Sequence, residues 1–374
     1  MKKLLTALLS TALLLPLAAC GGGNPSAQTT NADTAADVTT EKSADASTDT
    51  ITNPVTEAAT EAETDPETET PTTPPEEAAG FRVSAYVTVD SVDSIDPGHL
   101  SNGITDVILI GDQPSYMAFD GRGNITLTSQ AIHAIAKMKE YIGDLPIRLY
   151  CTLGGEFAQV VAFRRTREDL IPNILSFLEE YELDGVNFDW EFPTNATEQR
   201  NYSTFLTALG EALGDRYTLS VALAHYCADL TPEAIAAIDR VEMMNYDIWD
   251  DENMHASLPL AIESVQKMLE LGYRPEQINM GIPTYGRPMM GEAYWYDYRW
   301  YYNQLDENGM YYDESNGLTI SFNTYDTVYE KTVWAIENGL GGVMTFAVHC
   351  DLPASNEKAL HNAIGKAVAD AGLK

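Results

Sequence analysis

The chain has 374 residues, with 56 Asp and Glu against 22 Lys and Arg, for a formal net charge of −34. This charge argues against a nucleic-acid partner, because binding a phosphate backbone requires a basic surface. It also argues against binding to anionic lipid through a cluster of basic residues. At about 150 residues per domain, the length allows two domains or one large α/β barrel with appendages.

Residues 1–20 have the pattern of an export signal. Two lysines precede the apolar run Leu4–Leu17, which is too short to span a bilayer and is typical of a secretory signal. The run is followed by Ala-Ala-Cys20, which resembles the lipobox of bacterial lipoproteins. We predict a lipoprotein signal peptide over 1–19 and lipid attachment at Cys20, which would anchor the exported protein on the outer face of the cell membrane. An ordinary signal peptide is the alternative.

The segment 20–80 has the composition of a linker. It contains no Phe, Trp or Tyr, and it holds 13 acidic residues against one basic residue, Lys42. Thr, Ala, Glu and Pro dominate it, so it cannot bury enough apolar surface to offset the entropy lost on ordering. We predict a disordered acidic tether over 20–80 and one folded domain over 81–374.

The predicted domain alternates short β-branched runs with amphipathic stretches. The runs predict strands at 82–89, 104–110, 147–153, 184–190, 217–223, 241–246, 278–282 and 342–347. The amphipathic stretches predict helices at 129–141, 167–181, 198–213, 232–238, 260–271, 329–338 and 356–371.

Eight strands in alternation with helices predict a parallel sheet closed as a single (β/α)8 barrel. A doubly wound open sheet is the runner-up, but it usually has a Gly-rich turn after its first strand, which residues 89–92 lack. In a barrel, chemistry is expected at the carboxyl ends of the strands.

Cysteine usage gives no sign of a metal centre. Beyond Cys20 the chain has Cys151, Cys227 and Cys350, without CxxC or HExxH spacing. His349-Cys350-Asp351 is a local cluster only. No metal or cofactor is predicted, and one disulfide among the three thiols is left open.

The end of the fourth predicted strand carries the most unusual pattern. Asn187, Asp189 and Glu191 alternate with apolar residues, so strand geometry puts the three polar side chains on one face. In a barrel that face points inward. Carboxyl groups so close cannot easily ionise together, so one of them is held protonated, as a general acid near neutral pH requires.

Residues 183–191 resemble the signature of glycoside hydrolase family 18, which contains chitinases and endo-β-N-acetylglucosaminidases. Four further segments resemble the family's third, sixth, seventh and eighth strands, namely Arg148–Gly155, Met244–Asp247, Met280–Arg287 and Gly339–Thr345. The resemblance covers essentially all of 81–374, and the family's fold is a (β/α)8 barrel.

The resemblance implies a retaining, substrate-assisted mechanism without metal or cofactor. Glu191 would protonate the leaving glycosidic oxygen, and the substrate's own 2-acetamido carbonyl would attack the anomeric carbon. Asp189 would orient the acetamide, Tyr246 would hydrogen-bond its carbonyl and Asp247 would contact the sugar. The implied partner is a GlcNAc-containing glycan, bound by a monomer. Substrate contacts are also predicted at Tyr86, Met244, Trp249, Tyr285 and Phe346.

Two positions depart from the family pattern. Asn187 stands where Asp is commoner, so we expect it to keep a hydrogen bond to Asp189 while removing a charge and shifting the pH profile. Phe346 stands where chitinases usually place a Trp as the floor of the −1 site. Either Phe346 still serves as the floor or the pocket is remodelled.

The connection from Arg287 to Asn323 is rich in aromatic residues between 294 and 302. It follows the seventh predicted strand, and its length of about 36 residues predicts a short hairpin insertion. Its aromatic rings either line outer sugar subsites or form a hydrophobic cluster that braces the loop.

Three functions remain open from the sequence. The first is hydrolysis of β-1,4-linked GlcNAc chains such as chitin oligomers. The second is endo-β-N-acetylglucosaminidase action on N-glycans or peptidoglycan. The third is a catalytically inactive carbohydrate-binding protein, which the presence of Glu191, Asp189 and Tyr246 disfavours.

Overall fold

The structure, a computed structural model, describes residues 80–111, 115–155, 161, 164–290 and 295–373. The predicted signal peptide, Cys20 and the predicted linker as far as residue 79 lie outside the described residues. Among the helices that are described, none combines the length and the apolar character needed to cross a membrane.

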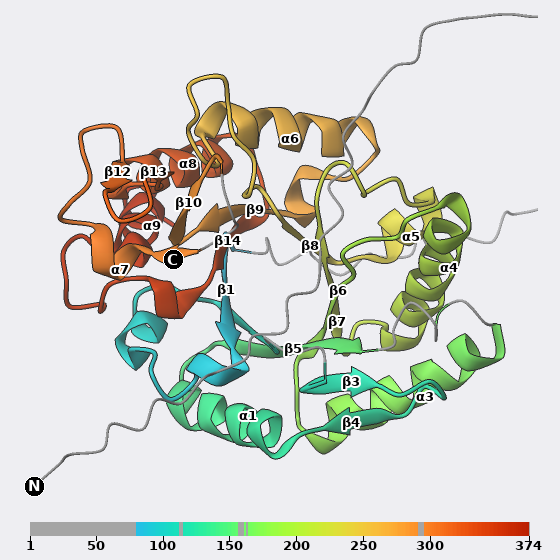
Figure 1. The fold of residues 1–374 in the computed structure, drawn as a ribbon. Coiled ribbons are helices and arrows are strands. Elements are labelled where there is room, and N and C mark those ends of the chain that lie inside the picture. Colours follow the sequence, from blue (N-terminus) through green and yellow to red (C-terminus); the bar gives the residue numbers. More distant parts are fainter. Residues whose placement is uncertain (1–79, 112–114, 156–160, 162–163, 291–294, 374) are drawn as a thin grey trace, which may run out of the picture. The chain divides into compact units, whose positions relative to one another are not determined.

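Eight parallel strands form a closed ring at the centre of the molecule (Figure 1). They are β1 (Arg82–Thr88), β2 (Asp106–Ile110), β5 (Arg148–Gly155), β6 (Gly185–Asp189), β7 (Thr218–Leu223), β8 (Arg240–Met243), β9 (Ile278–Pro283) and β14 (Gly342–Phe346). Each strand pairs with the next in chain order, and β14 pairs with β1 to close the ring. The predicted barrel is confirmed.

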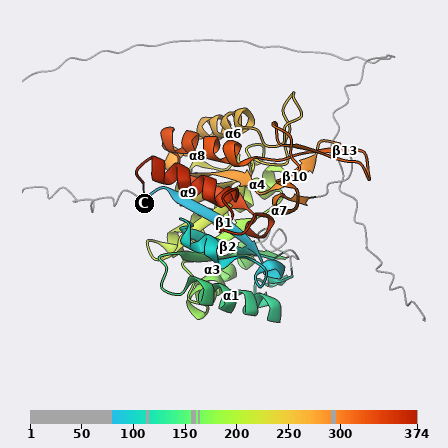
Figure 2. The ribbon, with the colours of Figure 1, turned by 90° about the vertical axis from the view of Figure 1, so that its left-hand side faces the viewer.

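Helices surround this ring (Figures 1 and 2). They are α1 (Ser129–Ile142), α3 (Arg164–Glu180), α4 (Ala196–Leu213), α5 (Pro232–Ala237), α6 (Leu258–Glu270), α8 (Tyr325–Glu337) and α9 (Leu360–Asp370). Each predicted helix is present, with its ends moved by a few residues. Strict alternation is wrong at the first crossover, because β1 and β2 are joined by the short 3-10 helices η1 (Val89–Ser91) and η2 (Pro97–Ser101).

Local sequence explains where a typical helix begins and ends. The Thr128 side chain accepts a hydrogen bond from the Ala131 N–H at the start of α1, and Gly143 takes a positive φ of 51° at its end. On the barrel, strand alternation sends Phe188 outward, where its ring meets Phe205 of α4 edge-on at 5.2 Å. Burying such a ring contributes about 2 kcal/mol or more, and it fixes the polar side chains of β6 to the barrel interior.

A small hairpin that the sequence did not predict precedes α1. It pairs β3 (Met117–Phe119) with β4 (Ile125–Leu127), and β3 extends the edge of β5. Strands of three residues are too short to show a period-two pattern.

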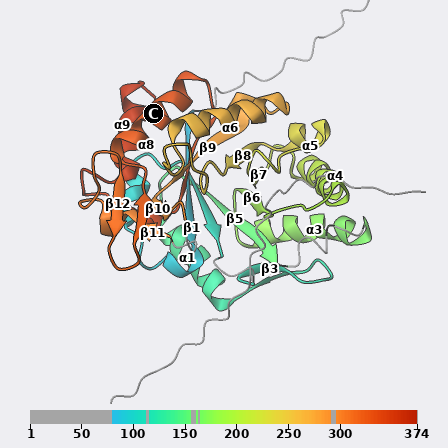
Figure 3. The ribbon, with the colours of Figure 1, turned by 45° about the horizontal axis from the view of Figure 1, so that its top comes forward.

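The insertion after β9 has about the predicted length but contains more strands than the predicted hairpin. It forms a four-stranded antiparallel sheet in the order β11-β10-β13-β12 and carries the short helix α7. Figure 3 shows this unit beside the barrel. Its elements are β10 (Tyr285–Pro288), β11 (Tyr296–Asp297), α7 (Tyr298–Tyr301), β12 (Met310–Asp313) and β13 (Leu318–Ser321). The prediction missed the pairing of β10 with β13, because the paired residues lie more than 30 positions apart.

Candidate active site

The carboxyl end of β6 brings the predicted polar row into the barrel. Asn187 is fully buried, and its amide oxygen accepts hydrogen bonds from the Thr152 hydroxyl at 2.8 Å and the Tyr86 hydroxyl at 3.2 Å. Its amide nitrogen donates to the Ser220 hydroxyl at 3.0 Å. The expected hydrogen bond from Asn187 to Asp189 is wrong, because neighbouring strands occupy the Asn187 amide instead.

Ser220 continues this hydrogen-bonded chain towards the other end of the barrel. Its hydroxyl donates to Glu242 Oε1 at 3.2 Å, and Asn279 donates to the same carboxylate at 3.0 Å. Arg82 in turn donates to the Asn279 side-chain oxygen at 3.1 Å. Asn187 is therefore held from several strands at once, which fixes the backbone from which Asp189 projects.

Asp189 ends β6 at the mouth of the barrel, and Glu191 follows two residues later. Asp189 Oδ1 is buried without a hydrogen-bond partner among the described residues. Burial and the neighbouring Glu191 carboxylate raise the pKa of Asp189. Glu191 is an exposed residue, and lost solvation and the Asp247 charge raise the pKa of its carboxyl too. The pair therefore retains a proton to higher pH than ordinary carboxyls do.

Tyr246 follows β8 and faces this pair. Burial, followed by the charges of Asp189 and Glu191, raises its pKa well above the ordinary value, so its hydroxyl stays neutral and able to donate a hydrogen bond. The Tyr246 ring lies 6.0 Å from Phe346, the last residue of β14, and Phe346 lies 5.5 Å from Tyr86. Phe346 thus lies beside both Tyr246 and Tyr86, and its role as the floor of a sugar site stays a prediction.

Asp247 is held by three side chains from other elements. It takes a left-handed φ of 61°, and its carboxylate pairs with Arg287 at 2.5 Å, accepts from the Tyr285 hydroxyl at 2.9 Å and lies 3.3 Å from His255 Nε2. Burial opposes ionisation, but the His255 hydrogen bond and the Arg287 guanidinium outweigh it and hold the pKa of Asp247 below its ordinary value. Asp247 is therefore an ionised carboxylate held in place next to the Asp189–Glu191 pair, which retains a proton.

We expect Arg287→Met to lower kcat/KM by about 10- to 100-fold, because a hydrogen-bonded charge would lose its partner. Loss of the positive charge raises the pKa of Asp247, so the acid limb of the pH profile should move to higher pH. Initial rates between pH 4 and 8 would measure both effects. Arg299→Met is the matched control, since Arg299 pairs with Asp297 at 2.8 Å in the insertion. Equal pH profiles for Arg287→Met and Arg299→Met would contradict the role of Arg287 in holding the Asp247 carboxylate.

The remaining predicted contacts fall into two groups. Tyr86 and Tyr285 are almost fully buried, and their hydroxyls bond to Asn187 and Asp247. Met244 and Trp249 are partly exposed, beside the end of β8 and beyond Asp247. The contact of these residues with substrate stays a prediction.

The fold brings four further residues to the mouth, and of these the sequence indicated only Trp295, as one of the aromatic residues between 294 and 302. Arg287 and His255 hold Asp247, and Trp295 stacks on Tyr285 at 4.9 Å. Tyr226, which is 64 % exposed, meets Phe192 edge-on at 5.4 Å next to Glu191. Arg287 lay within a recognised motif and Trp295 within the aromatic-rich stretch, whereas His255 and Tyr226 carry no local pattern.

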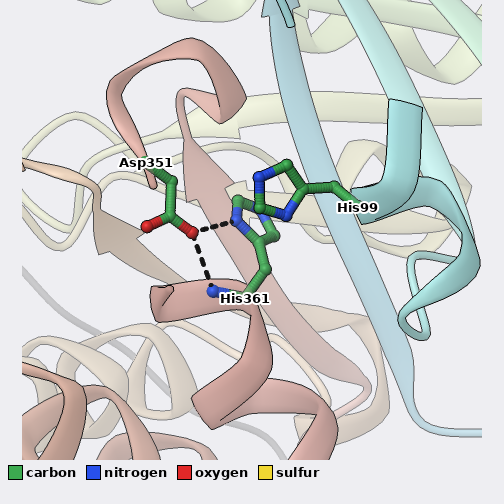
Figure 4. Close-up of side chains that lie close together, drawn as sticks. All are labelled: His99, Asp351 and His361. Carbon is green, nitrogen blue, oxygen red and sulfur yellow. Dashed lines mark hydrogen bonds and ion pairs between the residues drawn. The ribbon is translucent and has the colours of Figure 1, made fainter. Parts of the chain in front are cut away.

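One buried cluster has the composition of a metal site. Nitrogen and oxygen atoms of His99, Asp351 and His361 lie within 4.8 Å of one another (Figure 4). However, Asp351 Oδ2 accepts from both the backbone and Nδ1 of His361, and Oδ1 accepts from two backbone N–H groups. His361 Nε2 lies 3.0 Å from the Thr345 hydroxyl. The lone pairs of Asp351 and His361 are therefore occupied, while His99 Nδ1 is buried without a hydrogen-bond partner among the described residues. The contacts of Asp351 and His361 fit a structural role that ties α9 to the barrel.

His99 in this cluster should make the free energy of unfolding decrease at acidic pH. Burial, followed by the proximity of His361, lowers the pKa of His99 to about 4. The pKa of His99 is lower in the folded protein than in the unfolded chain. The contribution of neutral His99 to the free energy of unfolding is therefore complete above about pH 6.5 and is lost as the pH falls towards 4. We expect His99→Phe to reduce the loss of unfolding free energy between pH 7 and pH 4 by about 3 kcal/mol, measured by urea denaturation. The same loss in both proteins would refute this.

The three cysteines of the domain are free and buried. Burial raises the pKa of the Cys227 thiol to about 11, so it remains a neutral thiol. The disulfide left open by the sequence is not formed.

Comparison with known proteins identifies the fold and the family. The family model for glycosyl hydrolases family 18 matches residues 86–351. Chitinase A1 of Niallia circulans is 26 % identical over 285 residues, covering 56 % of this chain and 40 % of the relative. Chitinase 1 of Aphanocladium album is 25 % identical over 256 residues, covering 53 % of this chain and 60 % of the relative. The chain thus spans about half the length of these curated relatives.

Solved structures show the same architecture. A chitinase of Bacteroides thetaiotaomicron has a TM-score of 0.66 at 19 % identity, covering 78 % of this chain and 97 % of its own. A family 18 chitinase of Flavobacterium johnsoniae has a TM-score of 0.64 at 22 % identity, covering 79 % and 96 %. Since the family model matches more than half of the sequence, the chain belongs to glycosyl hydrolase family 18.

Proposed function

We propose that the protein hydrolyses β-1,4-linked N-acetylglucosamine glycans, chitin or chito-oligosaccharides, with retention of configuration. The observation that carries this proposal is the convergence of Glu191, Asp189, Tyr246 and Asp247 at one barrel mouth, with a raised pKa for the acidic pair and a lowered one for Asp247. The family relationship supports the same chemistry.

In the first step Glu191 gives its proton to the glycosidic oxygen as the bond from that oxygen to the anomeric carbon breaks. The carbonyl oxygen of the substrate's own acetamide forms the new bond to the anomeric carbon, and the leaving sugar departs with the proton. The product on the enzyme is a cyclic oxazolinium ion. The pair's raised pKa values keep the proton available near neutral pH.

Asp189 and Tyr246 act on that acetamide. The Asp189 carboxylate orients the amide N–H and stabilises the positive charge as it forms, and the neutral Tyr246 hydroxyl donates to the carbonyl oxygen. Asp247, fixed by Arg287, binds a sugar hydroxyl. In the second step water attacks the anomeric carbon, Glu191 takes its proton, and the acetamide is released with configuration retained.

The direct test is to incubate the protein with N-acetylchitotetraose and read the products by mass spectrometry. Smaller oligomers from the parent but not from Glu191→Gln would establish the reaction. An intact substrate with both proteins would rule out soluble chitin chains as substrate.

Endo-β-N-acetylglucosaminidase action on N-glycans or peptidoglycan is the second candidate, because it uses the same catalytic groups. Glycoprotein and peptidoglycan digests would reveal it. A lectin-like function is less well supported: a chitinase-like agglutinin of Robinia pseudoacacia has a TM-score of 0.59 at 17 % identity, which reflects the fold alone. All four proposed catalytic side chains stand in this chain.

We further propose that the enzyme works as a monomer at the cell surface, tethered through a lipid on Cys20 and the acidic segment 20–80. The lipobox-like sequence and the composition of the segment support this. Cys20→Ala should move the protein from the membrane fraction to the soluble exported fraction, and retention in the membrane would refute the anchor.

A further inference from the structure

The described surface carries several exposed aromatic rings. Among the described residues, Tyr226, Trp295, Trp300 and Tyr312 have between 49 % and 64 % of their surface exposed. Trp300 and Tyr312 lie in the insertion, and the Arg299 guanidinium lies 4.9 Å from the Trp300 ring. Trp295 also belongs to the insertion, but its ring contacts are with residues of the active site.

Trp295 is fixed by two of those residues. Its indole stacks on the Tyr285 ring at 4.9 Å and 24°, and it meets the Phe346 ring edge-on at 5.4 Å and 81°. Tyr285 donates to Asp247, and Phe346 packs on Tyr246. One face of the indole is thus occupied by Tyr285, while about half of the Trp295 surface remains exposed.

The order of the strands places this ring across the mouth from the acid. Glu191 follows β6, and Phe346 ends β14, which lies four strands from β6 in either direction around the ring. A sugar resting on Phe346 and Trp295 would therefore face Glu191. The insertion brings Trp295 to a position where no barrel strand supplies an exposed indole.

We propose that Trp295 is a sugar-stacking residue: its open face binds the apolar face of an N-acetylglucosamine ring next to the scissile bond. This inference rests on the proposed function. An aromatic face complements the C–H face of a pyranose. Because Tyr285 and Phe346 already hold the indole, little rotamer freedom is lost on binding. The insertion then takes part in substrate binding and does more than brace the barrel.

The test measures binding without turnover. In the full chain carrying Glu191→Gln, the affinity for N-acetylchitotetraose is measured by calorimetry, with Trp295→Ala, Trp295→Phe or Trp300→Ala added. We expect about tenfold weaker binding for Trp295→Ala, partial recovery for Trp295→Phe and no change for Trp300→Ala. Circular dichroism and thermal unfolding establish that each variant is folded. Equal affinities for Trp295→Ala and Trp300→Ala would overturn the proposal.

Turnover separates this inference from the proposed function. With Glu191 intact, Trp295→Ala should raise KM for the tetramer more than it lowers kcat, because stacking binds substrate without moving a proton. If the parent cleaves the tetramer and Trp295→Ala has the same KM, the stacking role fails while the function stands. If the parent neither binds nor cleaves the tetramer, both fail.

Discussion

Glu191→Gln is expected to lower kcat by about 10²- to 10⁴-fold, the usual contribution of a positioned general acid. Gln has nearly the same shape but no proton to give to the leaving oxygen, so KM should change little. Steady-state kinetics on N-acetylchitotetraose would measure both constants.

The matched control is Glu211→Gln, an exposed glutamate on α4 away from the mouth. This variant should keep the parent's kcat. A Glu191→Gln enzyme with more than a tenth of the parent's kcat would mean that another group supplies the proton.

Asp189→Asn is expected to lower kcat by about 10²- to 10³-fold, comparable to the loss of one group that stabilises developing charge. Asn cannot balance the positive charge of the oxazolinium ion. The substitution also removes a negative charge beside Glu191, which lowers the pKa of Glu191. The basic limb of the kcat/KM profile should therefore move to lower pH.

The pH profile distinguishes this role from a purely structural one. A misfolded variant loses rate at every pH without moving the limb. A profile with an unchanged basic limb would show that Asp189 and Glu191 do not share a proton, and the mechanism would need a different partner for Glu191.

The barrel and its acidic row could be predicted because both depend on local patterns. Alternation puts Asn187 and Asp189 on the same face of β6, which ends at Asp189, and Glu191 follows two residues beyond the strand. The helices α1 and α4 follow from their apolar spacing, whereas the capping residues Thr128 and Asn195 were seen only in the structure.

The contacts that tune the site could not be predicted, because they join distant parts of the chain. Asp247 depends on Arg287, 40 positions later. Asn187 accepts a hydrogen bond from Thr152 and donates one to Ser220, and neither partner is near it in sequence. The insertion, which was expected to be a hairpin, is a four-stranded sheet, and no local pattern reveals the pairing of its strands. Burial and long-range pairing, not spacing, decide these features.

In the proposed mechanism the substrate's own acetamide is the nucleophile. Digesting partially deacetylated chitosan and identifying the sugar at each new reducing end tests it most directly. The proposed mechanism predicts N-acetylglucosamine at every new reducing end, because a sugar without an acetyl group has no carbonyl oxygen to attack the anomeric carbon. New reducing ends that include glucosamine in proportion to its content in the polymer would contradict substrate assistance and require a nucleophile from the protein.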